Sequence, residues 1–285
     1  MTFIHLYRDL VDGGALPLRR CARWRLLILT GVVFSVLAGC AGSSEVRTST
    51  SAEPFTESDE PEAFKRARIR LELATGYFEQ GQTSVALDEI KQALAANPSF
   101  GPAYVLRGLV YMRLNEPGQA EDSFRRALQI NGKDPDALHN YGWFVCQRGR
   151  YAEAKQFFDR ALGSPAYSGQ AKTLMAKGVC QIRMGDVVDA ERTLSRSYEL
   201  DAANPITGYN LALLVFQRKD YSRAQFYIRR LNNSELANAE SLWLGIKVER
   251  SLNNMPAVEQ LGQQLLRRFP TSPELAAYQR GAFHE

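Results

Sequence analysis

The feature that most constrains this chain is a spacing that recurs along most of its length. Bulky and small residues return at equivalent places in segments that begin at residues 67, 101, 135, 171, 205 and 239. The steps are 34 residues, except for one of 36 residues that falls at Gly163-Ser164-Pro165. A fixed period of this length is typical of proteins in which each unit buries its apolar face only against its neighbours. We therefore predict one elongated array of repeats and not two globular domains.

The unit is clearest in residues 135–162. Its positions 8, 20 and 27 hold Gly142, Ala154 and Ala161, which are small enough to let two antiparallel helices approach closely. Positions 4, 7, 11 and 24 hold larger residues that fill the space between the helices, and Gly149 at position 15 makes the turn. The pattern resembles the tetratricopeptide repeat (TPR). The resemblance implies an all-α, right-handed solenoid of six helix-turn-helix repeats within residues 61–285.

The first 39 residues have a different character. A basic stretch from Arg19 to Arg25 precedes twelve apolar residues, Leu26 to Leu37, and the small residues Ala38 and Gly39 lead to Cys40. Twelve apolar residues are too few to span a bilayer as a permanent helix. The segment resembles a bacterial lipoprotein signal peptide with its lipobox. The alternatives are an ordinary signal peptide and a buried helix with a chance Leu-Ala-Gly-Cys sequence.

The lipoprotein resemblance implies that residues 1–39 are removed and that Cys40 is acylated on its thioether and its amino group. Several acyl chains anchor a protein stably, whereas one chain gives only marginal binding. Ala41 is not the aspartate that resembles an inner-membrane retention signal, so we expect an outer-membrane lipoprotein that faces the periplasm. The sequence does not decide which start codon is used.

Residues 41–60 are rich in Ser, Thr, Glu and Pro and contain a single aromatic residue, Phe55. Such a composition buries too little apolar surface to fold. We predict that residues 40–60 form a flexible tether, and twenty such residues have a root-mean-square reach of about 25 Å. The net charge of +4 falls to about +1 once the leader, which contributes +3, is set aside. Nothing in this balance favours nucleic acid as a partner.

Two cysteines remain in the predicted repeats. Cys146 and Cys180 lie on the first helices of neighbouring units, which should pack side by side. In an oxidising periplasm a disulfide between them is expected as one alternative, and two small buried thiols are the other.

The sequence contains no recognisable catalytic or metal-binding motif. After the leader the only histidines are His139 and His284, and neither has a neighbour at metal-ligand spacing. We find no HExxH, GxSxG, CxxC or phosphate-binding glycine loop. We therefore predict a protein that is not an enzyme and needs no cofactor or metal.

The TPR resemblance implies that the first helix of each repeat lines a groove, chiefly through unit positions 2, 5, 9, 12 and 13. In this chain many of these positions hold apolar or aromatic residues, which suit a bound helix or extended peptide. The early repeats carry the densest apolar run. Asn140 is added because it resembles an asparagine that holds peptide backbone in some TPR proteins. The residues expected to contact a partner are Leu71, Phe78, Val105, Leu109, Met112, His139, Asn140 and Trp143. The alternative is that about half of these side chains only pack against the adjacent hairpin.

Three segments narrow the resemblance. They are residues 140–154, which contain Asn-Tyr-Gly-Trp-Phe and Arg-Tyr-Ala-Glu-Ala, residues 241–247, which read SLWLGIK, and residues 266–274, which read LRRFPTSPE. Together with the six repeats and Cys40 they resemble the type IV pilus pilotins, the TPR lipoproteins of the PilF/PilW family. The resemblance extends from the lipobox to about Gln279.

The family resemblance implies a function without catalysis. Such a lipoprotein binds the secretin subunit of the type IV pilus and promotes its localisation to the outer membrane and its multimerisation, on which twitching motility depends. An alternative is a TPR scaffold lipoprotein for outer-membrane-protein assembly or for the recruitment of cell-wall hydrolases. A further alternative is an enzyme or a regulator of one. The bound segment of the partner, the stoichiometry and the persistence of the complex are left open by the sequence.

Overall fold

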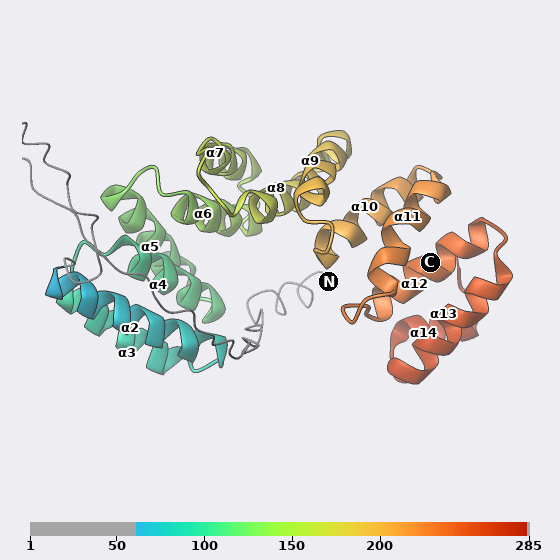
Figure 1. Cartoon of the computed structure of the whole chain (residues 1–285), viewed down its shortest axis with the longest axis horizontal. Helices are drawn as coiled ribbons and strands as arrows, with labels where there is room; N and C mark the ends of the chain where they lie inside the picture. The colour runs from blue at the N-terminus through green and yellow to red at the C-terminus, as the bar shows by residue number, and fades with distance from the viewer. Residues whose placement is uncertain (1–60, 284–285) are drawn as a thin grey trace, which may run out of the picture. The chain divides into compact units, whose positions relative to one another are not determined.

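The computed structural model describes residues 61–283, which are helical throughout with no β-strand among them (Figure 1). None of the helices in this range is long and apolar enough to cross a membrane. The predicted signal peptide, Cys40 and the tether lie outside the described residues. The helices are α2 (Glu62–Glu79), α3 (Thr83–Ala96), α4 (Gly101–Arg113), α5 (Pro117–Ile130), α6 (Pro135–Gln147), α7 (Tyr151–Leu162), α8 (Gln170–Met184), α9 (Val187–Leu200), α10 (Pro205–Gln217), α11 (Tyr221–Asn232), α12 (Ala239–Ser251), α13 (Met255–Arg268) and α14 (Pro273–Gln279).

Helices α2 to α13 form six antiparallel pairs, which confirms the predicted all-α repeat fold. Helices α5, α7, α9 and α11 each contact the first helix of their own repeat and the first helix of the following repeat, as α5 contacts α4 and α6. From α4 onward, successive first helices also contact one another, in the order α4, α6, α8, α10 and α12. The first helices therefore form one layer, which we call the inner layer, and the second helices form the other, the outer layer.

Every hairpin turns at unit position 15 through a residue in the left-handed region. The φ angles there are between 56° and 88°, and the residues are Gly81, Asn115, Gly149, Gly185, Lys219 and Asn253. Glycine adopts this conformation without steric cost, asparagine tolerates it, and lysine pays a penalty. The positions of these turns follow the period read from the sequence, including the 36-residue step.

The extra residues of that step form a loop over residues 163–169. The loop is not merely an insertion on the surface, because the Tyr167 side chain is buried against Leu138 and Ala161. Its hydroxyl hydrogen bonds to Thr173 on α8 at 3.0 Å. The loop thus closes the core between the third and fourth repeats.

The core of each hairpin depends on one small and one large residue at positions 8 and 24. A Cβ atom on Gly108 would lie 2.6 Å from the Phe124 ring, and one on Gly178 would lie 2.5 Å from Leu194 Cγ. The sixth repeat reverses the sizes, with a buried Ile246 at position 8 and Gly262 at position 24. A Cβ on Gly262 would meet the ring of Tyr278 at 2.4 Å. The reversal makes room for α14, which covers the end of the last repeat and was not predicted from the sequence.

Candidate partner-binding surface

The inner layer carries the residues that the sequence predicts to contact a partner. Leu71 on α2, Leu109 and Met112 on α4, and Asn140 on α6 are all partly exposed. Because α4 and α6 are in contact, Leu109, Met112 and Asn140 lie on adjoining helices of one layer. We call these three residues together with Leu71 the inner surface. Arg113 and Gln147, at position 13 of their repeats, are exposed and supply polar groups beside it.

The other four predicted residues are buried. Phe78, Val105, His139 and Trp143 are each less than one-tenth exposed. The Arg113 guanidinium lies 3.8 Å over the Phe78 ring and donates a hydrogen bond to the Phe78 carbonyl oxygen. Arg183 lies over the Trp143 ring at 5.1 Å. Phe78 and Trp143 thus pack against side chains of the next repeat, which is the packing alternative that the sequence analysis expected for about half of the set.

His139 in particular lies in the core of the described structure. It is 1% exposed, and its Nδ1 atom is hydrogen bonded to Thr173 Oγ1 at 2.9 Å. Burial, and secondarily the positive charge of Lys172, lowers the pKa of His139 from 6.5 to about 3. The imidazole is therefore neutral at physiological pH and connects α6 to α8. The repeat period places His139 at unit position 5 of the inner layer, but a period does not show which side chains of the next repeat cover it.

The Asn140 amide makes a hydrogen bond within its own helix. Its Nδ2 atom donates to the carbonyl oxygen of Asp136 at 2.8 Å. Asn210, at the same position of the fifth repeat, makes the equivalent bond to Ile206 at 2.8 Å. One N–H of each side-chain amide is thus bonded to the backbone of its own helix. The Asn140 side chain is partly exposed and also carries a second N–H donor and the Oδ1 acceptor.

Cys146 and Cys180 form a disulfide in the structure, with their Cα atoms 6.0 Å apart. The bond joins α6 to α8 within the inner layer and closes a loop with a sequence separation of 34 residues. Of the two alternatives left open by the sequence, the structure has the covalent one. It joins the third repeat covalently to the fourth.

The structure also exposes an apolar patch that the sequence analysis did not identify. Ile69 and Leu73 on α2 are each 44% exposed. Leu73 occupies unit position 7, which in later repeats packs toward the preceding repeat. In the first repeat, no preceding repeat covers position 7 within the described residues. The exposure of Leu73 could therefore have been predicted from the repeat period.

We find no site for metal chemistry in the described part of the chain. No three His, Cys, Asp or Glu side chains within residues 61–283 lie close enough together to hold an ion. The ionisable side chains of the outer layer form ion pairs instead, as Glu121 does with Arg125 and Arg150, at 2.8 Å each.

Comparison with known proteins agrees with this architecture. Two tetratricopeptide-repeat family models match residues 71–137 and 111–178. The type IV pilus assembly protein PilF of Pseudomonas aeruginosa is 26% identical over 254 residues, which cover 89% of this chain and 99% of that protein. The two family models together cover residues 71–178, and the PilF match covers most of the chain.

Solved structures give the same result. A structure of Pseudomonas aeruginosa PilF superposes with a TM-score of 0.71 and 25% identity, and covers 78% of this chain and 100% of its own. The crystal structure of PilW, described as a widely conserved type IV pilus biogenesis factor, has a TM-score of 0.67 and 31% identity, and covers 74% of this chain and 97% of its own. The repeat pattern, the helical architecture and these matches together show that the chain belongs to the PilF/PilW family of tetratricopeptide-repeat proteins of type IV pilus biogenesis.

Proposed function

We propose that this protein is an outer-membrane lipoprotein adaptor that binds the secretin subunit of the type IV pilus and promotes its localisation to the outer membrane and its multimerisation. The proposal is supported by the inner surface. In the first two repeats of this chain, which belongs to the PilF/PilW family, the apolar side chains of Leu71, Leu109 and Met112 are partly exposed. Partly exposed apolar side chains beside polar ones are typical of a protein-binding surface. Acyl chains on Cys40 would anchor the protein in the outer membrane. Residues 41–60 would form the tether that lets the repeats extend away from the membrane surface.

The test of the binding surface is a double substitution, Leu109→Glu with Met112→Glu. Two carboxylates on this surface would have to be desolvated by an apolar partner, so we expect secretin multimers and twitching motility to be lost. A matched control is Val188→Glu on α9, because Val188 is an exposed apolar residue of the outer layer. Circular dichroism of the purified variants checks that both remain folded.

Retention of multimers and motility in the folded double variant would refute the assignment of this surface. Loss of envelope integrity with normal piliation would favour the alternative, a scaffold for outer-membrane-protein assembly or cell-wall hydrolases. The anchor is tested separately with Cys40→Ala and radiolabelled palmitate. We expect the label and the outer-membrane fractionation to be lost together.

A further inference from the structure

The second helices of the early and the late repeats differ in what they expose. Within residues 61–283, neither α5 nor α7 carries a strongly exposed large apolar side chain. The second helices of the last three repeats do, and these residues are Val187, Val188, Leu200, Phe226, Met255 and Leu266. Charge differs as well, because α5 and α7 each hold two basic and two acidic residues, whereas α11 holds three arginines and no acidic residue. The late part of the outer layer is therefore more apolar and, along α11, more basic.

An exposed aromatic cluster extends across α9 and α11. Phe226 is 63% exposed, and its ring centroid lies 6.3 Å from that of Tyr198 on α9 and 5.2 Å from that of Tyr227. The Tyr198 and Tyr227 rings are 5.1 Å apart and nearly perpendicular. Leu200 follows Tyr198 by two residues and is 52% exposed. We call these four residues the aromatic patch.

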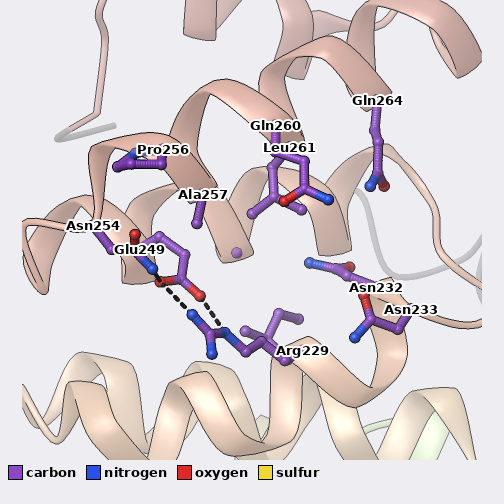
Figure 2. Close-up of a pocket in the computed structure, with 12 residues that line it drawn as sticks. Arg229, Asn232, Asn233, Glu249, Asn254, Pro256, Ala257, Gln260, Leu261 and Gln264 are labelled. Carbon is purple, nitrogen blue, oxygen red and sulfur yellow. Dashed lines mark hydrogen bonds and ion pairs between the residues drawn. The ribbon is translucent and has the colours of Figure 1, made fainter.

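An exposed arginine borders the aromatic patch. Burial raises the pKa of Tyr198, and the nearby positive charge of Arg230 opposes that rise, so the two side chains are neighbours. The other two arginines of α11 are committed to carboxylates of adjacent repeats, Arg223 to one on α9 and Arg229 to Glu249 on α12 (Figure 2). Arg230 has no ion-pair partner within the described part of the chain. Its charge is therefore available to a ligand.

The acidic residue beside the patch does not cancel this charge. The Glu199 carboxylate lies 3.9 Å from the Arg196 guanidinium, and both side chains are exposed. The two together are neutral, so Arg230 leaves the surface beside the patch positive. A basic side chain near an anionic lipid surface is attracted to it, and the attraction falls off within a Debye length. The surface is complementary in charge to anionic phospholipid.

The shape of the surface favours a lipid over a protein as its ligand. Protein partners usually anchor their side chains in pockets. The cavity of about 480 Å³ between α11 and α13 is lined by Arg229 but by no residue of the aromatic patch, and the small cavity beside Cys180 is not lined by one either (Figure 2). A membrane needs no pocket. Aromatic side chains with an apolar body and a polar tip lie at the level of the headgroups, and a guanidinium pairs with phosphate.

We propose that the aromatic patch and Arg230 dock on anionic phospholipid at the surface of the membrane that holds the protein. Phe226 and Leu200 enter the headgroup region, and Arg230 pairs with a lipid phosphate. The inference rests on the proposed function in one respect, namely that acyl chains on Cys40 keep the chain at a membrane. Because the anchor makes docking an intramolecular event, a weak affinity of the patch for lipid is sufficient.

Docking by the outer layer has a consequence for the inner surface. Phe226 and Arg230 lie on α11, a helix of the outer layer, whereas Leu109 and Met112 lie on α4 in the inner layer. A protein that rests on lipid through its outer layer turns its inner surface away from the membrane. The inner surface then faces the compartment from which a polypeptide partner arrives.

The experiment places the photoreactive residue p-benzoylphenylalanine at position 226 of the full chain in cells, and irradiates intact envelope membranes. We expect the purified chain to gain the mass of one phospholipid. The same probe at position 188, which is exposed on α9 but outside the patch, should give no lipid adduct. Arg230→Glu should lower the adduct at position 226 about fivefold or more. The matched control Arg126→Glu, an exposed arginine of α5, should leave it unchanged.

A protein adduct at position 226 in place of lipid would overturn the proposal, as would the absence of any adduct. Equal lipid adducts at positions 226 and 188, or equal adducts in the two glutamate variants, would overturn it as well. If circular dichroism shows that the chain with the probe at position 226 is unfolded, the probe at position 200 decides, with the same expectations.

The membrane anchor is measured separately in the same cells by palmitate labelling of Cys40. A labelled chain without a lipid adduct at position 226 would overturn the docking and leave the proposed anchor intact. A lipid adduct in an unlabelled chain would refute the anchor and leave the docking intact. The failure of the inference and the failure of the proposed function are thus distinguishable.

Discussion

The interface between the third and fourth repeats and the interface between the fifth and sixth share one geometry but differ in what fills them. In the first, Lys177 of α8 donates to Asp159 of α7, and a disulfide joins α6 to α8. In the second, position 7 is Gly245, against which Asn232 and Leu261 pack, and a buried carboxylate, Glu249, pairs with Arg229. The repeat period determines where the helices lie, whereas the residues at positions 7 and 11 determine which groups fill the space between neighbouring repeats.

The two interfaces also differ in how they bury polar groups. The third-to-fourth interface buries neutral ones, in a chain of hydrogen bonds from Tyr167 to Thr173 to His139. The fifth-to-sixth interface buries a charge, and Glu249 is 1% exposed. A neutral network and an ion pair respond differently to mutation and to pH, so each can be tested without the other.

The largest expected effect is loss of the covalent link in the first interface. Reduction of the Cys146–Cys180 disulfide releases a loop with a sequence separation of 34 residues in the unfolded state. The chain-entropy estimate for such a loop is about 3–4 kcal/mol of unfolding free energy. Guanidinium unfolding of the oxidised and the reduced protein measures the difference. The control is the double variant Cys146→Ala with Cys180→Ala, which should not respond to reductant. Identical midpoints for oxidised and reduced wild type would contradict the stabilising role.

The next effect concerns the charge in the second interface. Burial raises the pKa of the Glu249 carboxyl, but hydrogen bonds from Arg229, Asn254 and Gln225 outweigh burial and hold the pKa below its usual value. The ionised form is therefore favoured by the fold. Glu249→Ala leaves its three donors without their acceptor and should cost about 3 kcal/mol.

The control for that substitution is Glu259→Ala, since Glu259 is exposed on α13. Its free energy of unfolding should change by less than about 0.5 kcal/mol. Chemical denaturation at neutral pH compares the two variants with wild type. A Glu249→Ala protein as stable as the control would mean that the pair contributes no net stability to the second interface.

The repeat itself was predictable from the sequence because close helix packing demands small residues at fixed positions. Gly142, Gly149 and Phe158 predict the helical hairpin from the sequence alone, and the 34-residue period then predicts the position of every turn. The helix α14 was missed because Gly262 in place of a large residue reads as a degenerate repeat. Only the position of Tyr278 shows that the glycine makes room for another helix.

The candidate surface was predicted less well, because a period assigns a residue to a layer and not to solvent. Leu109 and Trp143 both occupy position 9, yet Leu109 is partly exposed and Trp143 is 3% exposed with Arg183 over its ring. Which side chain is covered depends on the length and charge of its neighbours in the next repeat. The close packing at Gly245 was missed for a related reason, since it depends on the Asn232 side chain from the preceding repeat.

The smallest expected effect separates the two interfaces by pH. The pKa of His139 is lowered to about 3 by burial, so the unfolded chain takes up a proton near pH 6.5 while the folded chain does not. The unfolded state binds more protons as pH falls below 6.5, and stability falls with it. Between about pH 7.5 and pH 5 the loss should be about 2 kcal/mol, in a range where Glu249 stays ionised. His139→Gln retains a hydrogen-bonding amide beside Thr173 but cannot titrate. Chemical denaturation at the two pH values should therefore show that this variant loses about 2 kcal/mol less unfolding free energy than wild type does. Equal losses in variant and wild type would show that the proton-linked stability resides elsewhere than in the third-to-fourth interface.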